Sequence, residues 1–193
     1  MFRAKEGAED DRDAGAAELM ALKPRIEDLV VGIAASGITP YVHGALAAAR
    51  DAGAATALIT AGNPDNPPAE HVIRLKTGPE VLAGSTRMKA GTATKIVLNM
   101  ISTGAMVRIG KVHDNLMVDL RVGSSKLRHR AIRLLSNLTG LSAEASATAL
   151  DHADGEVKTA VVAHGLGISP EESRHRIHRA GGHLRGALGE VSP

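Results

Sequence analysis

One strand, helix, strand unit constrains the fold more than any other part of the sequence. The run "DLVVGIAA" at Asp28–Ala35 is continuous, apolar and rich in β-branched residues, which is typical of a strand buried on both faces of a parallel sheet. The run "ATALIT" at Ala55–Thr60 has the same character. Between the two runs, Thr39 is a natural N-cap, Pro40 suits a first helical turn and Gly53 suits a helix end. Since such a crossover is right-handed and its strands are parallel, we predict an α/β fold.

The other elements extend this unit on both sides. We expect a helix at Ala14–Leu22, a third strand "HVIRLK" at His71–Lys76, helices over about 86–107 and 124–137, and a small helical bundle from Gly140. The bundle contains "SPEE", Ser169–Glu172, which has the spacing of a capping box. The predicted architecture is a doubly wound, mostly parallel sheet domain over residues 1–139, incomplete at its N-terminus, and a small all-helical domain over residues 140–193.

Composition sets limits on what the chain does. With 193 residues, 44% of them apolar, the chain can bury a core, and its net charge of only +2 does not indicate a partner that is a polyanion. There is no cysteine, which fits a reducing compartment. The charged opening "MFRAKEGAEDDRD" does not resemble a secretory signal, and the best apolar run is short and interrupted. We therefore expect a soluble, cytoplasmic protein with no membrane partner.

The turn "ASGIT" at Ala35–Thr39 is the first candidate site, because ligands of open parallel sheets bind beyond the carboxyl ends of the strands. Gly37 permits a tight turn, and the hydroxyls of Ser36 and Thr39 can donate to phosphate oxygens. The turn matches neither a dinucleotide fingerprint nor a Walker A loop. The alternative, which the pattern favours equally, is a capped turn whose hydroxyls form hydrogen bonds only with the following helix.

The stretch "GPEVLAGSTRMKAGTATK", residues 78–95, is the second candidate site. It places Arg87 and Lys89 in what is expected to be the first turns of a helix, where the positive pole of the dipole disfavours cations unless an anion is present. Ser85 or Thr86 can cap this helix, so that N–H groups, hydroxyls and a cation would hold a phosphate or carboxylate together. Alternatively, the basic side chains lie in solvent.

Two glutamates accompany these sites. Glu80 is either a structural partner of Arg87 or an acid within the second site. Glu9, judged by its surroundings in "EGAEDD", is one member of a solvated acidic run.

Histidine and arginine clusters point to weaker alternatives. His175, His178 and His183 lack the spacing of a complete zinc site, so no metal is expected. A basic face near the C-terminus has no aromatic residues to stack on bases, which argues against a nucleic-acid partner. Its members are Arg128, Arg130, Arg133, Arg174, Arg176 and Arg179.

Three motifs carry a resemblance to a known family. The stretch from Gly78 to Leu120, "EGAEDDRDAG" at Glu6–Gly15 and "VVGIAASGITPYV" at Val30–Val42 resemble the N-acetylmuramic acid 6-phosphate etherase family, which is related to glucokinase regulatory protein. The closing "HRAGGHLRGAL" is similar as well. The resemblance covers essentially the whole chain and implies a sugar isomerase fold, a small helical C-terminal domain and a homodimer.

The resemblance also implies a reaction and a site. Family members cleave the D-lactyl ether of N-acetylmuramic acid 6-phosphate, a phosphorylated amino sugar, by elimination and hydration without a cofactor or metal. By the resemblance, Glu9 is a catalytic residue, most naturally the general base. The substrate-binding residues that it implies, together with Glu80 from the second site, are Ser36, Gly37, Thr39, Ser85, Thr86 and Lys89. The alternative is a regulatory module that binds a sugar phosphate without turnover, or an inactive fragment.

The chain also departs from the family pattern. It has no "GAGTSGR"-like phosphate loop and no second catalytic glutamate upstream of Glu9, and the family carries on the order of a hundred more residues at this end. We expect the sequence to correspond to the C-terminal two thirds of such a protein, through a shortened reading frame, a separate chain that supplies the rest, or loss of function. The sheet edge left uncovered predicts poor stability in isolation.

Overall fold

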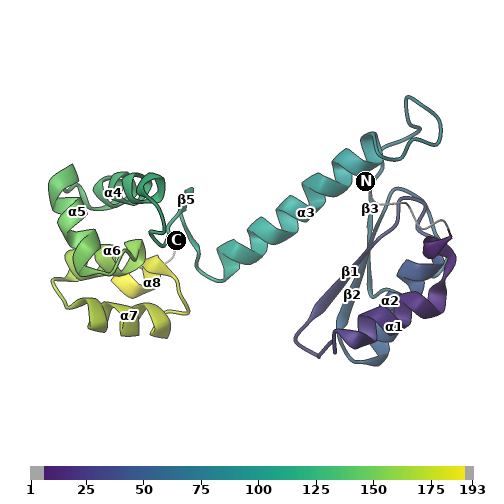
Figure 1. The fold of residues 1–193 in the computed structure, drawn as a ribbon, viewed down its shortest axis with the longest axis horizontal. Coiled ribbons are helices and arrows are strands. Elements are labelled where there is room, and N and C mark those ends of the chain that lie inside the picture. Colours follow the sequence, from purple (N-terminus) through teal and green to yellow (C-terminus); the bar gives the residue numbers. More distant parts are fainter. Residues whose placement is uncertain (1–6, 190–193) are drawn as a thin grey trace. The chain divides into compact units, whose positions relative to one another are not determined.

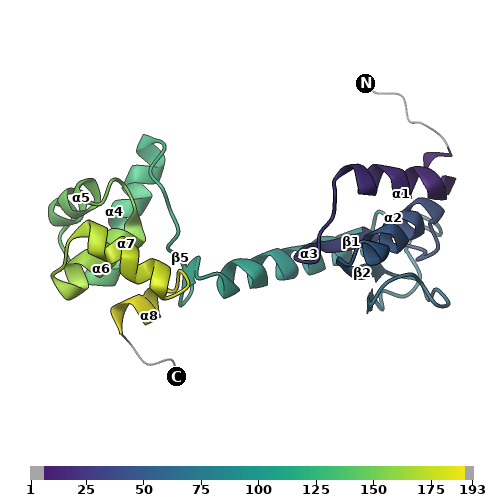
Figure 2. The ribbon, with the colours of Figure 1, turned by 90° about the horizontal axis from the view of Figure 1, so that it is seen from below.

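Two compact units make up the protein (Figures 1 and 2). The computed structural model describes residues 7–189, and the contacts among them separate between Asn99 and Met100. We call residues 7–99 the N-terminal unit and residues 100–189 the C-terminal unit. The boundary after residue 139 that the sequence suggests differs from this division and stays a prediction.

A three-stranded parallel sheet lies in the N-terminal unit. Its strands are β1 (Leu29–Ile33), β2 (Ala55–Thr60) and β3 (His71–Arg74), in the spatial order β1-β2-β3. Leu58, on the central strand, is fully buried in one apolar cluster with Leu46, which lies on the helix between β1 and β2. The predicted α/β class and the parallel strands are confirmed.

Strand β1 is less buried than its apolar sequence predicts. The side chains of Leu29 and Ile33 at its two ends are 52% and 46% exposed. Among the described residues, β1 pairs only with β2, so it forms an edge of the sheet, and an apolar edge strand is a surface on which another chain can pair. The prediction that this strand is buried on both faces is therefore wrong for its ends.

Two helices pack closely on each other beside the sheet, α1 (Arg12–Ala21) and α2 (Pro40–Asp51) (Figure 1). Each places a glycine against a backbone carbonyl of the other. A Cβ at Gly44 would overlap the carbonyl oxygen of Arg12 and lie 2.9 Å from its carbon, and a Cβ at Gly15 would lie 2.8 Å from the carbonyl carbon of Tyr41. The absence of these side chains permits the close approach.

Helix α3 (Lys89–Arg108) begins three residues later than the sequence suggests and spans the division between the units. It is followed by a hairpin that was not predicted, formed by β4 (Val112–His113) and β5 (Leu116–Met117). Asp114 in the connecting turn has a positive φ of 51°, a conformation that aspartate tolerates better than most residues. The Asp-Asn pair at the turn was the available sequence signal.

Helices α4 to α8 enclose the core of the C-terminal unit. They are α4 (Ser125–Thr139), α5 (Ala143–His152), α6 (Val157–Leu166), α7 (Pro170–Arg179) and α8 (Leu184–Leu188). Their largest fully buried side chains include Leu135, Leu150 and Leu184. The Ser169 hydroxyl caps α7 by accepting from the N–H of Glu172, as predicted. The Glu172 carboxylate accepts from Arg179, so only one of the two hydrogen bonds of a capping box is present.

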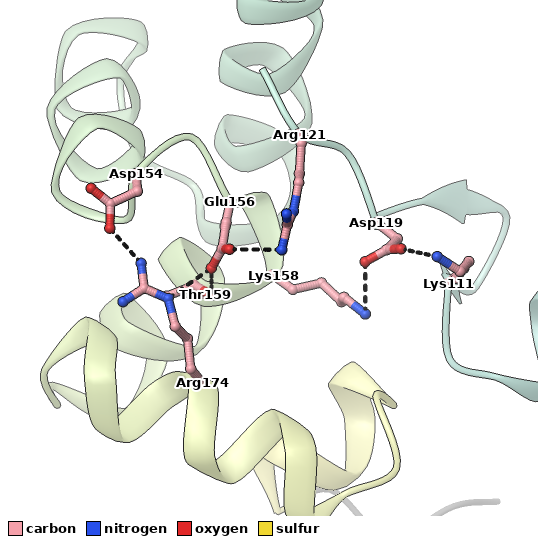
Figure 3. Close-up of polar contacts among 8 residues, drawn as sticks. All are labelled: Lys111, Asp119, Arg121, Asp154, Glu156, Lys158, Thr159 and Arg174. Carbon is pink, nitrogen blue, oxygen red and sulfur yellow. Dashed lines mark hydrogen bonds and ion pairs between the residues drawn. The ribbon is translucent and has the colours of Figure 1, made fainter. Parts of the chain in front are cut away.

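Glu156, at the N-cap of α6, joins several segments of this unit (Figure 3). Its carboxylate accepts from Arg174 Nε at 2.8 Å, from Thr159 Oγ1 at 2.9 Å and from Arg121 at 3.3 Å. Burial alone raises the pKa of Glu156, but the bonds from Arg174 and Thr159 outweigh it and hold the pKa below its ordinary value. Arg174 also pairs with Asp154 at 2.6 Å, so one guanidinium ties α7 to the loop before α6.

Lys158 makes a second junction in the same view (Figure 3). Its ammonium lies 3.1 Å from Asp119 and donates to the carbonyls of Gly110 at 3.3 Å and Gly182 at 3.2 Å. Burial opposes ionisation of Asp119, but hydrogen bonds from Lys111 and Lys158 prevail, so the pKa of Asp119 is lowered. The end of α3 and the hairpin are thereby fastened to α6 and to the turn after α7.

Candidate functional site

The turn between β1 and α2 has a conformation that requires glycine at its centre. Gly37 is buried, with φ at +83°, and its N–H donates to the carbonyl of Ala34 at 3.0 Å. A Cβ there would lie 2.7 Å from Cγ of Pro64, in the loop after β2, and 2.8 Å from Oγ1 of Thr60, the last residue of β2. His43 fixes the turn from α2, since its Nε2 lies 2.7 Å from the carbonyl oxygen of Gly37.

The two hydroxyls of this turn have different roles. Ser36 Oγ accepts from the N–H of Ile38 at 3.3 Å, which is the local role that the alternative of a capped turn expects. Thr39 occupies the N-cap position of α2, but its side chain makes no capping hydrogen bond. Because the first N–H groups of a helix have no partner within the helix, the open end of α2 and the Thr39 hydroxyl together can receive an anion.

The second candidate site contains an anion of its own. The carboxylate of Glu80 accepts from the backbone N–H of Lys89 at 2.9 Å through Oε2 and from that of Ala90 at 3.0 Å through Oε1. These hydrogen bonds from Ala90 and Lys89 hold the pKa of Glu80 below its ordinary value. The negative charge that the start of α3 demands is thus supplied from within the chain, nine residues before the helix.

The remaining residues of this stretch form turns before α3. The carbonyl of Ser85 accepts from the N–H of Met88 at 3.1 Å, and that of Thr86 accepts from Gly91 at 2.9 Å. Lys89 is the first residue of α3, and its side chain is exposed. The helix begins at Lys89, and not near Thr86, because the Glu80 carboxylate caps it there.

We expect the Glu80 cap to hold the loop that carries Ser85 and Thr86. Substitution Glu80→Ala should accelerate amide hydrogen exchange at Lys89 and Ala90 severalfold, because both N–H groups lose their acceptor. Glu80→Gln, which keeps one acceptor oxygen, should give an intermediate rate. Since the pKa is depressed, the protection should persist as the pH falls through the ordinary range of glutamate and be lost only below it.

Arg87→Gln is the matched control for the Glu80 substitutions. It tests the alternative in which Glu80 acts as a partner of Arg87, and it should leave exchange at both amides unchanged. Equal acceleration in Arg87→Gln and Glu80→Ala would contradict the capping role.

Glu9 lies in a short 3₁₀ helix, Ala8–Asp10, directly before α1, and its side chain is exposed. Gly7 precedes it with φ at +77°, and Asp11 caps α1 by accepting from Ala14 at 2.9 Å. Among the described residues, no hydrogen bond or ion pair joins Glu9 to either of the two turns.

The structure does not join the predicted site residues to each other by direct contacts. Between residues 7 and 189, no hydrogen bond or ion pair connects the turn at Ser36–Thr39 with the loop at Ser85–Lys89. A cavity of about 420 Å³ in the N-terminal unit lies instead between α1, β1 and α2, against Leu19 and Val42. The assignment of the seven substrate-binding residues and of Glu9 therefore stays a prediction.

Sequence reasoning missed two features of the site. The capping role of Glu80 has only a weak signal, a glutamate nine positions before the helix, because the loop between them sets the geometry. The contact of His43 with the turn could not be predicted either, because it depends on how α2 is oriented relative to the turn. In the part of the chain that the structure describes, no group of three or more potential ligands is arranged to hold a metal ion. None of the helices within residues 7–189 has the length and apolarity needed to cross a bilayer.

Comparison with curated proteins gives a consistent set of relatives. The chain is 50% identical to a protein of Rubrobacter xylanophilus over 98% of its own length and 63% of the relative's length. It is 55% identical to a protein of Symbiobacterium thermophilum, over 84% of the chain and 55% of that relative. It is 48% identical to a protein of Deinococcus radiodurans, over 97% of the chain and 62% of that relative. All three are named N-acetylmuramic acid 6-phosphate etherase.

The match covers most of this chain but only part of each relative. The chain spans less than two thirds of the length of these relatives, and no protein-family model matches it. Identity at this level over most or nearly all of the chain indicates common ancestry. Over the region that it spans, the chain is therefore a relative of proteins named N-acetylmuramic acid 6-phosphate etherase.

Proposed function

We propose that the protein acts in cleaving the D-lactyl ether of N-acetylmuramic acid 6-phosphate, giving N-acetylglucosamine 6-phosphate and D-lactate. The observation that carries the proposal is the turn after β1. There the Thr39 hydroxyl makes no capping hydrogen bond, so that it and the first N–H groups of α2 can donate to a phosphate. The names of the relatives support the same substrate class. We place the reaction in the cytoplasmic recycling of cell-wall sugars.

The proposed reaction is an elimination followed by a hydration. In the ring-opened sugar, the C1 aldehyde acidifies the C2 proton, so a carboxylate base can remove it while an acid protonates the lactyl oxygen that leaves C3. Water then adds across the C2–C3 double bond, which restores the hydroxyl at C3. Such a sequence needs two carboxyl groups in opposite protonation states. By family resemblance, Glu9 is one of them and acts as the base.

Substrate binding divides between the two turns in this proposal. Gly37 keeps the backbone clear of the ligand, and Thr39 donates its hydroxyl to the sugar phosphate. Ser85, Thr86 and Lys89 contribute hydroxyls and a positive charge toward the lactyl carboxylate or the phosphate. The Glu80 carboxylate, which holds the start of α3, contributes by keeping this loop in place.

Assembly into a homodimer is a further part of the proposal. Helix α3 exposes large apolar side chains, among them Ile96 at 53%, Met100 at 67% and Met106 at 45%. A surface helix normally buries its apolar residues, and exposed apolar patches mark sites of association.

D-lactate release from N-acetylmuramic acid 6-phosphate tests the proposal. We would assay the chain itself and the chain joined to the part of the Rubrobacter relative that it does not match. Release by at least one form is expected, and release by neither would contradict the enzyme assignment and favour a regulator that binds sugar phosphates. Sedimentation velocity on the same samples should show a dimer, and monomers alone would contradict that part of the proposal.

A further inference from the structure

A second anion site is indicated on the C-terminal unit, in a cavity of about 420 Å³ between α4, the β4–β5 hairpin and the start of α5. Leu116, Met117 and Leu134 give it apolar walls, and Arg130 and Arg133 are its charged members. The volume lies in the range of sites for small molecules. The cavity is confined to the C-terminal unit and shares no residue with the proposed sugar-phosphate site.

The two arginines of this cavity differ from the other arginines that follow α3. Neither Arg130 nor Arg133 has a hydrogen-bond or ion-pair partner within residues 7–189. Every other arginine from 109 to 189 has one: Arg121 with Glu156, Arg128 with Asp151, Arg174 with Glu156 and Asp154, Arg176 with the Ala187 carbonyl, Arg179 with Glu172, and Arg185 with Asp114. The cavity therefore gathers the two guanidinium groups that the fold leaves unpaired.

The lining of the cavity brings no negative charge to these two groups. No aspartate or glutamate is among the described residues that line the cavity, and α4 contains no acidic residue. Arg130 and Arg133 lie three residues apart and so share one face of the helix, where two like charges repel each other. The amide side chains of Asn115 and Asn137 line the same cavity and add uncharged donors.

We propose that this cavity binds a small organic phosphate. Two guanidinium groups on one helix face can hold a phosphate through paired, charge-assisted hydrogen bonds, and the ligand's anion removes their mutual repulsion. The body of the ligand then lies along Leu116 and Leu134. A nucleic-acid polymer fits less well, because none of the described residues that line the cavity is an aromatic on which a base could stack.

Side-chain NMR of the full chain tests this site separately from the N-terminal one. The Nε–Hε signals of Arg130 and Arg133, assigned through single glutamine variants, should shift and saturate on titration with glucose 6-phosphate and with inorganic phosphate. Uncharged glucose should leave them in place. The double variant Arg130→Gln, Arg133→Gln should weaken the binding reported by Asn115 and Asn137 at least about tenfold, the equivalent of losing one charge-assisted hydrogen bond.

The matched control removes two charges elsewhere on the same unit. Lys126→Gln with Arg179→Gln changes the net charge equally but lies outside the cavity, so it should leave this affinity nearly unchanged. Equal weakening by both double variants would show diffuse charge attraction and overturn the proposal. The proposal would also be overturned if the two arginine signals did not respond to millimolar glucose 6-phosphate. It would be overturned too if a single-stranded oligonucleotide bound more tightly than glucose 6-phosphate and both double variants weakened that binding alike.

Discussion

Substitution Glu9→Gln is expected to lower the rate of D-lactate release by about 10³-fold, within the range that removal of a general base costs. Glutamine is close to glutamate in size but cannot accept a proton at neutral pH, so the C2 proton would lose its acceptor. Because Glu9 is exposed and has no hydrogen-bond partner among the described residues, the exchange should leave folding unaffected. The assay is D-lactate release by whichever form of the chain is active.

The control for Glu9→Gln is Asp13→Asn. Asp13 is a neighbouring exposed carboxylate in the first turn of α1, and its loss should leave turnover nearly unchanged. The Michaelis constant should also stay nearly constant in Glu9→Gln, since the base acts in the transition state and contributes little to ground-state binding. A regulator without turnover would instead bind sugar phosphates equally well with either residue, and equal losses in both variants would argue against a catalytic role for Glu9.

Substitution Gly44→Ala is expected to lower the free energy of unfolding of the N-terminal unit by about 2 kcal/mol or more, as overpacking typically does. The added methyl would overlap the carbonyl of Arg12, and a backbone carbonyl within α1 cannot turn aside as a flexible side chain would. The helices would have to separate, which would disturb the reciprocal contact of Gly15 with Tyr41. Helix propensity alone predicts the opposite sign, since alanine favours helix over glycine by up to about 1 kcal/mol.

Urea unfolding followed by Tyr41 fluorescence measures this effect. Tyr41 is the only tyrosine, there is no tryptophan, and its hydroxyl donates to Glu18 across the contact between α1 and α2. Gly91→Ala in α3 is the matched control, because its Cβ would meet only the Thr86 carbonyl at an ordinary 3.4 Å. It should leave the unfolding midpoint unchanged or raise it. A midpoint that falls equally in both variants would mean that the close helix contact does not limit stability.

Local patterns explain how much of the fold was predictable. Strand β2 was predicted with its observed bounds, Ala55–Thr60, because a continuous β-branched run between turn signals has few alternatives. The capping of α7 by Ser169 follows from short-range spacing in the same way. By contrast, the exposed ends of β1 depend on which strands pair with it, and the contact of Gly44 with Arg12 depends on how two helices cross.

In the candidate site, too, local features could be predicted and contacts that depend on the folded chain could not. The turn at Ser36–Thr39 could be predicted because a strand end, a glycine and an N-cap are all readable in sequence. The partner of Glu80 could not, because a loop of irregular conformation returns its carboxylate to the start of α3. The arginines of α4 were grouped with those of α7 as one basic face, and only the hydrogen bonds and ion pairs of the folded chain separate Arg130 and Arg133 from the rest.

The ammonium of Lys158 restricts what its position can accept. An ammonium has three N–H bonds directed toward the corners of a tetrahedron, and here three acceptors surround it: Asp119 and the carbonyls of Gly110 and Gly182. A guanidinium carries the same charge, but its donors lie in one plane and suit a carboxylate or phosphate better than three separate oxygens. Charge conservation alone is therefore a poor guide at this position, since the shape of the cation decides whether the junction can form.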